Sequence, residues 1–192
     1  MRRFLKILCV LLGIGMLAGA ALVMVSWQRG IGTWEAKNRT CVDTLYTLIP
    51  EPQGAVPEER RDNTMSVLSL DGTDFIGILE MPRHSSSLPV CGTWGSINKY
   101  PCCLQGSVYD RSIRIGATSQ TGQFDFYREI SVGDSVYFTD MEGNRFSYTV
   151  TDVRYEKHAD ETAFLREASD LILFVKNLYG FEYILIYCQM AN

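Results

Sequence analysis

An uncharged apolar run near the amino terminus constrains this 192-residue chain more than any other feature. Residues 7–25 form a stretch of 19 positions without a charged side chain, close to the ~20 that a helix needs to cross a bilayer. Arg2, Arg3 and Lys6 precede the run, and Trp27 follows it where an interfacial aromatic would lie. Because positive residues beside such a helix stay in the cytoplasm, we predict a single-pass membrane anchor with the C-terminal domain extracellular.

A cleaved secretory signal peptide is the alternative interpretation of the same segment. Residues 17–20 (LAGA) supply the small side chains that a cleavage site needs. The apolar run is longer than the about 7–15 residues typical of a signal peptide, and it continues past these small residues. Both features favour an uncleaved anchor.

The rest of the chain has the size and charge of one ordinary globular domain. Removing the anchor leaves roughly 160 residues, enough for a single hydrophobic core. The formal net charge of −4 lacks the basic excess typical of nucleic-acid binding, so we predict no nucleic-acid partner. We divide the chain into a cytoplasmic tip and anchor (1–27), a stalk helix and linker (28–64) and a β domain (65–192).

The stalk is predicted to be helical up to a proline. Val42, Leu45 and Ile49 recur at helical spacing, and Pro50 stops the helix. Residues 51–63 are rich in Pro, Glu, Arg and Asp, a composition typical of a linker.

From Met65 onward, short apolar segments alternate with turn residues. Gly143 and Asn144 tolerate the positive φ of a hairpin turn, and residues 146–150 alternate on one face after it. Many short strands at this spacing predict a closed barrel or a sandwich. The predicted strands are 75–80, 113–115, 135–139, 146–150, 171–175 and 183–187, with a loop at 85–87 before residues 88–90 and one short helix at 162–168.

Four of these segments together resemble the sortase family, the cysteine transpeptidases of Gram-positive cell walls. They are residues 75–82 (FIGILEMP), 88–90 (LPV), 133–138 (GDSVYF) and 170–174 (DLILF), in the family's order and spacing. The resemblance, which is class B-like, covers about residues 65–189. It implies a mainly β fold: an eight-stranded sortase barrel with short helices, preceded by the transmembrane helix.

The positions of the three catalytic residues differ from the family pattern. Sortases carry a His after a segment like Ile-Ala-Gly, and that position falls on Thr118, or on Ala117 in a register shifted by one residue. The nucleophilic Cys at the end of its strand is replaced by Lys176. The Arg that begins the last strand is replaced by Tyr183, or by Glu182 in the shifted register.

These replacements remove the chemistry that the resemblance implies. A sortase needs a thiolate nucleophile, a His to move protons and an Arg to stabilise the oxyanion. Acylation of Lys176 would give a stable amide instead of a labile thioester, and Thr118 is a weak nucleophile without a base. We therefore predict no catalytic residue and no cofactor, and a sorting-signal-like peptide or a surface protein as the partner.

The remaining cysteines and histidines suggest no replacement site. The outer domain has five cysteines and no C-x-x-C pair, which argues against zinc and leaves any disulfide pairing open. These cysteines are Cys41, Cys91, Cys102, Cys103 and Cys188, and the only histidines are His84 and His158. Neither histidine fits the family spacing.

Three functional hypotheses follow from the sequence. The first is a pseudoenzyme with a sortase barrel that binds a peptide or scaffolds a partner. The second is an active transpeptidase or hydrolase with relocated residues, which requires a cysteine of depressed pKa. The third is a purely structural envelope protein. Because one fold hosts many functions, the fold alone does not decide among them.

Overall fold

The computed structural model describes residues 2–51, 63–157, 167–178 and 182–191. The chain forms two compact units, Met1–Lys37 and Asn38–Asn192, and each is considered by itself. The predicted linker at 51–63 and the predicted helix at 162–168 lie almost entirely outside the described residues. Residues 167 and 168, the two described members of that predicted helix, are not helical.

One long helix, α1 (Arg2–Leu48), forms the first unit up to Lys37. The remaining residues of α1 belong to the second unit. Its helical state over residues 42–48 confirms the prediction from apolar spacing. Within the described part of the chain, no helix combines the length with the apolar character of a membrane span. The transmembrane anchor therefore stays a prediction from the sequence.

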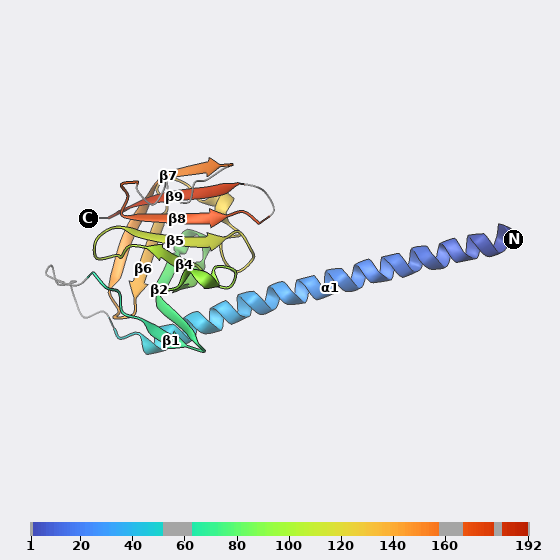
Figure 1. The fold of residues 1–192 in the computed structure, drawn as a ribbon, viewed down its shortest axis with the longest axis horizontal. Helices are drawn as coiled ribbons and strands as arrows, with labels where there is room; N and C mark the ends of the chain where they lie inside the picture. Colours follow the sequence, from blue (N-terminus) through green and yellow to red (C-terminus); the bar gives the residue numbers. More distant parts are fainter. Residues whose placement is uncertain (1, 52–62, 158–166, 179–181, 192) are drawn as a thin grey trace. The chain divides into compact units, whose positions relative to one another are not determined.

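The second unit is a β-barrel closed by hydrogen bonds around its whole circumference (Figure 1). Eight strands form the ring in the order β2–β3–β4–β5–β8–β9–β7–β6, and β6 pairs back with β2. The pairs β3–β4 and β5–β8 are parallel, and β1 adds to the outside of β2. The strands are β1 (Leu68–Leu70), β2 (Thr73–Met81), β3 (Ser86–Cys91), β4 (Cys102–Gln105), β5 (Ile113–Thr118), β6 (Ser135–Asp140), β7 (Arg145–Glu156), β8 (Leu171–Lys176) and β9 (Tyr183–Met190).

The structure confirms the predicted mainly β, eight-stranded barrel with short helices. All six predicted strands are present, and β1, β3 and β4 are additional. The predicted loop at 85–87 is wrong in part, because β3 begins at Ser86 and pairs with β2. Three short 3-10 helices lie between strands: η1 (Pro82–His84), η2 (Trp94–Ser96) and η3 (Tyr127–Glu129). The predicted hairpin turn is also present, with Gly143 at φ +86° and its N–H donating to the carbonyl of Asp140.

Strand alternation divides the barrel wall into an inner and an outer face. Successive side chains of a strand point to opposite faces, and the inner faces form one large core that includes Ile113, Ile115 and Leu173. The end of α1 covers part of the outside of β2, where Leu45 packs with Ile78 in a second cluster. The core thus fixes which residues of each strand face outward.

A disulfide joins the end of β3 to the start of β4. Cys91 and Cys102 are bonded, with their Cα atoms 4.6 Å apart, and they close the loop that carries η2. The two residues are also direct partners in the parallel β3–β4 ladder. This pairing resolves what the cysteine count leaves open.

Removing this disulfide is expected to lower the free energy of unfolding by about 3 kcal/mol, because it closes a loop of about a dozen residues in the unfolded chain. The double variant Cys91→Ala/Cys102→Ala should show this loss in thermal unfolding of the full chain in detergent micelles. Cys103→Ala, a change at the neighbouring thiol that is not in a disulfide, is the matched control and should lose clearly less. Equal losses in both variants would contradict a crosslinking role.

Candidate functional site

The strand register brings the three predicted positions together in one row. Thr118 at the end of β5 pairs with Lys176 at the end of β8, and Lys176 pairs with Tyr183 at the start of β9. The preceding β8 residue, Val175, belongs to the barrel core. Alternation therefore places all three side chains of the Thr118–Lys176–Tyr183 row on the outer face.

On β5, the alternative position Ala117 does not lie on this outer face. Ala117 and Ile184, which flank the row, belong to the core of the barrel. A side chain at the position of Ala117 would therefore point into the core and not toward Lys176. Of the two positions on β5, Thr118 is therefore the one that faces outward beside Lys176.

Thr118 is buried and its hydroxyl has a neutral partner. Its backbone N–H and its Oγ1 both donate to Oε1 of Gln123, at 3.0 and 3.1 Å. Gln123 in turn donates through Nε2 to the carbonyl of Ile97, at 3.1 Å. Because a Gln amide takes up no proton at neutral pH, this arrangement gives Thr118 no general base.

The other two members of the row have different surroundings. Lys176 is exposed, so its ammonium group is in contact with water. Tyr183 is half-buried and stacks on Phe174, with ring centroids 5.1 Å apart and planes 20° from parallel. Neither contact prepares a nucleophile or an oxyanion site.

Trp94 covers the outer face next to this row. The adjacent row consists of Gly116, Phe174 and Leu185. A Cβ on Gly116 would lie 2.6 Å from ring atom Cη2 of Trp94, so the indole rests on the bare backbone of β5. Trp94 is itself 37% exposed. The indole of Trp94 thus covers the outer surface of β5 two residues before Thr118.

Comparisons with known proteins identify this architecture. No protein-family model and no curated protein sequence matches the chain. The barrel is similar to the solved structure of sortase C1 from Streptococcus agalactiae, with a TM-score of 0.55 and 18% identity over 73% of this chain and 79% of that chain. The sortase fold is shown.

Two further solved structures have the same likeness. Sortase A from Corynebacterium diphtheriae matches with a TM-score of 0.54 and 12% identity over 84% of each chain. Sortase C from Clostridium perfringens was solved with the C-terminal cell wall sorting motif. It matches with a TM-score of 0.53 and 21% identity over 62% of this chain and 72% of that chain. These relatives are class C and class A, and the class B-like character stays a prediction.

The two thiols that lie in barrel strands outside the disulfide are far from an activated state. Burial raises the pKa of Cys103 to about 11, and the negative charge of Asp110 adds to this rise. A hydrogen bond with the backbone of Gln105 lowers the pKa, but by less. Burial also raises the pKa of Cys188 well above its ordinary value. Cys188 pairs with Leu171, at the other end of β8 from Lys176 and about 16 Å away along the strand.

One histidine has a structural environment and the other lies outside the described residues. The ring of His84 stacks on Phe126, with centroids 4.7 Å apart, and its Nε2 lies 3.3 Å from Oδ2 of Asp134. Burial would raise the pKa of Asp134, but hydrogen bonds from Ser131, Arg83 and His84 lower it overall. His158 falls in the undescribed segment.

The described residues hold no cluster of three or more His, Cys, Asp or Glu side chains arranged for a metal ion. The sortase fold in this chain presents Thr118, Lys176 and Tyr183 at three adjoining strand ends, and the contacts described for these three residues include no activated group. Sequence reasoning identified these three positions but missed Gln123, five residues beyond Thr118, and Trp94, because no recognisable pattern marks the loops that carry them.

Proposed function

We propose that this chain is a catalytically inactive protein of the sortase fold, a pseudoenzyme that binds a peptide or scaffolds a partner at the envelope of a Gram-positive cell. The observation that carries the proposal is the Thr118–Lys176–Tyr183 row. It occupies the positions where the family resemblance expects His, Cys and Arg, and none of the three side chains can replace those groups.

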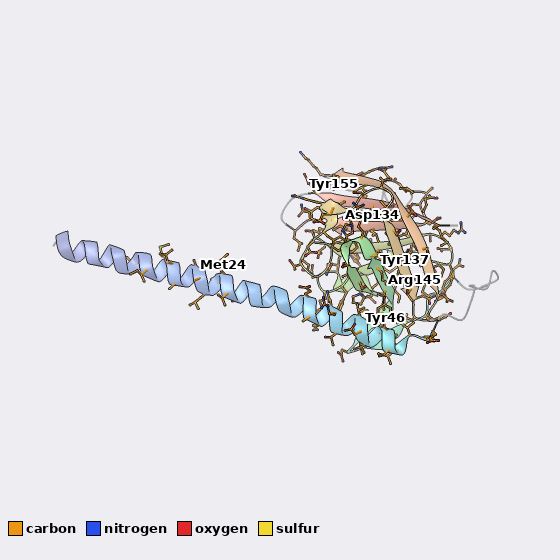
Figure 2. All side chains as sticks on the ribbon, turned by 180° about the vertical axis from the view of Figure 1, so that it is seen from behind. Met24, Tyr46, Asp134, Tyr137, Arg145 and Tyr155 are labelled. Atoms are coloured by element: carbon orange, nitrogen blue, oxygen red, sulfur yellow. A yellow bond between two sulfur atoms is a disulfide. The ribbon has the colours of Figure 1, made fainter. Side chains whose placement is uncertain are left out.

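We further propose that residues 1–27 anchor the protein in the cell membrane, with the barrel outside. Large apolar side chains of α1 are exposed in the first unit, among them Leu17, Leu22 and Met24. Met24 is labelled in Figure 2. A bilayer would bury these side chains, which water solvates poorly. The Cys91–Cys102 disulfide supports an extracytoplasmic barrel, because disulfides persist in oxidising compartments.

A sorting-signal-like peptide is the proposed partner. One protein of the same fold was solved with a C-terminal cell wall sorting motif. A second candidate function is scaffolding without peptide binding, and the position of Trp94 over Gly116 favours it. The two candidates differ in whether the outer face of β5 and β8 opens for a ligand.

The experiment incubates the full chain in detergent micelles with a library of Leu-Pro-x-Thr-Gly peptides and an amine acceptor. Mass spectrometry then measures cleaved or joined peptides and any covalent adduct on the protein. We expect product no greater than in buffer alone and no adduct, because the row offers no thiolate. A sortase that turns over one of these peptides under the same conditions serves as the positive control.

Turnover above the buffer rate would overturn the pseudoenzyme proposal, and the site of the adduct would identify a relocated nucleophile. Fluorescence anisotropy of the same labelled peptides distinguishes the two candidates. Saturable binding without turnover supports the peptide-binding pseudoenzyme. Absence of binding, together with proteins that co-purify with the full chain but not with a variant lacking the barrel, supports the scaffold.

A further inference from the structure

A pocket of about 260 Å³ lies where the end of α1 meets the β6–β7 hairpin. The helix side contributes Tyr46, Ile49, Pro50 and Glu51, and the hairpin side contributes Thr139, Gly143 and Arg145. All of these residues belong to the second unit. The pocket is smaller than the roughly 300–1,000 Å³ of sites for drug-sized ligands, so it suits a fragment of a larger molecule.

Thr139 leaves a polar atom in this pocket without a partner. The residue is 7% exposed, and its Oγ1 is buried with no hydrogen-bond partner among the described residues. Its neighbour Phe138 belongs to the barrel core, so the side chain of Thr139 points outward toward the pocket. A buried hydroxyl without a partner costs about 1–3 kcal/mol, which a ligand hydrogen bond would recover.

The walls of the pocket are held in place by a network of charged and aromatic side chains. Arg145 lies 4.4 Å from the ring centroid of Tyr137, and its Nη1 is 2.6 Å from Oε2 of Glu80 (Figure 2 labels both Tyr137 and Arg145). Burial raises the pKa of Tyr46 to about 12, and the carboxylate of Glu80 adds to the rise. These contacts link the helix side of the pocket to the strand side.

The hairpin turn also fixes the shape of the pocket. Gly143 has φ +86°, and a Cβ there would overlap the backbone carbonyl oxygen of Pro50. Only glycine allows the turn to approach the end of α1 so closely. The pocket is therefore a built feature of the contact between α1 and the barrel.

The chemistry of the lining selects an uncharged ligand. Arg145 is already paired with Glu80, and Glu51 adds a negative charge to the wall, so an anionic ligand would be repelled. Ile49, Pro50 and the ring of Tyr46 offer apolar contact. The hydroxyl of Thr139 both donates and accepts, and an amide group offers both complementary atoms.

We propose that this pocket binds one apolar side chain of a partner peptide together with its adjoining backbone amide, which hydrogen-bonds to Thr139. The site is separate from the Thr118–Lys176–Tyr183 row. The pocket lies at the start of β7, at Arg145, whereas Tyr183 of the row pairs with Glu156 at the other end of β7, eleven residues further along. The proposal therefore stands independently of the function proposed above.

The test titrates the ¹⁵N-labelled full chain in detergent micelles with N-acetyl-leucine N-methylamide. We expect saturable shifts of the amide signals of Thr139 and Gly143, with a Kd in the millimolar range. N-acetylglycine N-methylamide, which lacks the apolar side chain, and 4-methylpentanoate, which carries a charge, should bind at least tenfold more weakly.

Thr139→Val separates a ligand site from a structural role. The variant should bind the leucine amide about tenfold more weakly, yet its Tm should rise by about 2–4 °C because a buried hydroxyl without a partner is removed. Thr47→Val, the same change at an exposed position of α1, is the matched control and should alter neither measurement. Ile49→Trp fills the pocket from the helix side and should abolish the shifts.

Three results would overturn the proposal. One is the absence of saturable shifts at Thr139 and Gly143 with the leucine amide. Another is equal affinity of the wild-type chain and Thr139→Val. The third is binding of the carboxylate as tightly as the amide, which would show that the pocket prefers an anion.

Discussion

Replacement of Arg114 by Met is expected to lower the free energy of unfolding by about 4 kcal/mol. Arg114 lies on β5 and is only 4% exposed. Its Nη1 donates to the carbonyl of Ser169 at 2.9 Å, and its Nη2 donates to the carbonyl of Glu167 at 2.8 Å. Removing the guanidinium loses two charge-assisted hydrogen bonds and leaves both carbonyls without this donor, and each bond contributes about 1.5–3 kcal/mol.

The electrostatic surroundings of Arg114 explain why a buried charge is tolerated there. Burial lowers the pKa of the guanidinium, while the nearby carboxylates of Asp110 and Asp170 oppose that change. An uncharged side chain of similar length would keep the packing but not these interactions. The loss in the free energy of unfolding for Arg114→Met should therefore exceed the loss expected from packing alone.

Thermal or urea unfolding of the full chain in detergent micelles measures this effect. Arg111→Met, an exposed arginine three residues earlier, is the matched control and should change stability by less than about 0.5 kcal/mol. The loss of unfolding free energy for Arg114→Lys should lie between those of Arg114→Met and Arg111→Met. An ammonium group keeps the charge but cannot reach both carbonyls in the same geometry. A loss below about 1 kcal/mol for Arg114→Met would mean that other groups hold residues 167–169 in place.

The sequence predicts the barrel well because its strands carry a local signal. In β7, Phe146, Tyr148 and Val150 alternate with polar residues, and all three side chains are buried in the core. The short strand β4 lacks this signal, since Cys102 and Cys103 are adjacent and the strand has only four residues. Its position depends on pairing with β3 and β5, to which it is joined by the loops at 92–101 and 106–112.

The candidate site is predictable only in part, for the same reason. The positions of Lys176 and Thr118 follow from their places in recognisable strands. That they are direct partners across a parallel ladder follows from the closed ring of strands. The cover of Trp94 over Gly116 depends on a loop tied down by a disulfide, and no local pattern indicates it.

Substitution of Lys176 by Cys is expected to raise the rate of thiol labelling at pH 7.5 by at least about thirtyfold over the parent chain. Both proteins carry Cys9→Ala, so that the thiol in the predicted anchor does not contribute. Among the barrel thiols outside the disulfide, Cys103 is half-buried with a pKa of about 11, and Cys41 and Cys188 are buried. The exposed position of residue 176 suits a thiol with an ordinary pKa near 8.5.

The magnitude follows from the fraction of thiolate in each case. At pH 7.5 a thiol of pKa 8.5 is roughly 10% ionised and one of pKa 11 roughly 0.03%, a ratio of about 300. The higher intrinsic nucleophilicity of the more basic thiolate reduces this ratio by about tenfold. Labelling of the parent chain should therefore also rise about tenfold for each pH unit until the pH approaches 11.

The measurement uses a charged maleimide without reductant, followed by mass spectrometry to locate the label. Leu178→Cys, which places a thiol at another exposed position two residues further along the chain, is the matched control and should react as fast as Lys176→Cys. Rapid labelling of the parent chain at Cys41, Cys103 or Cys188 would reveal a thiolate poised for catalysis and favour an active enzyme with relocated residues. Slow labelling of all three removes that hypothesis, because a cysteine transpeptidase needs an accessible thiolate near neutral pH.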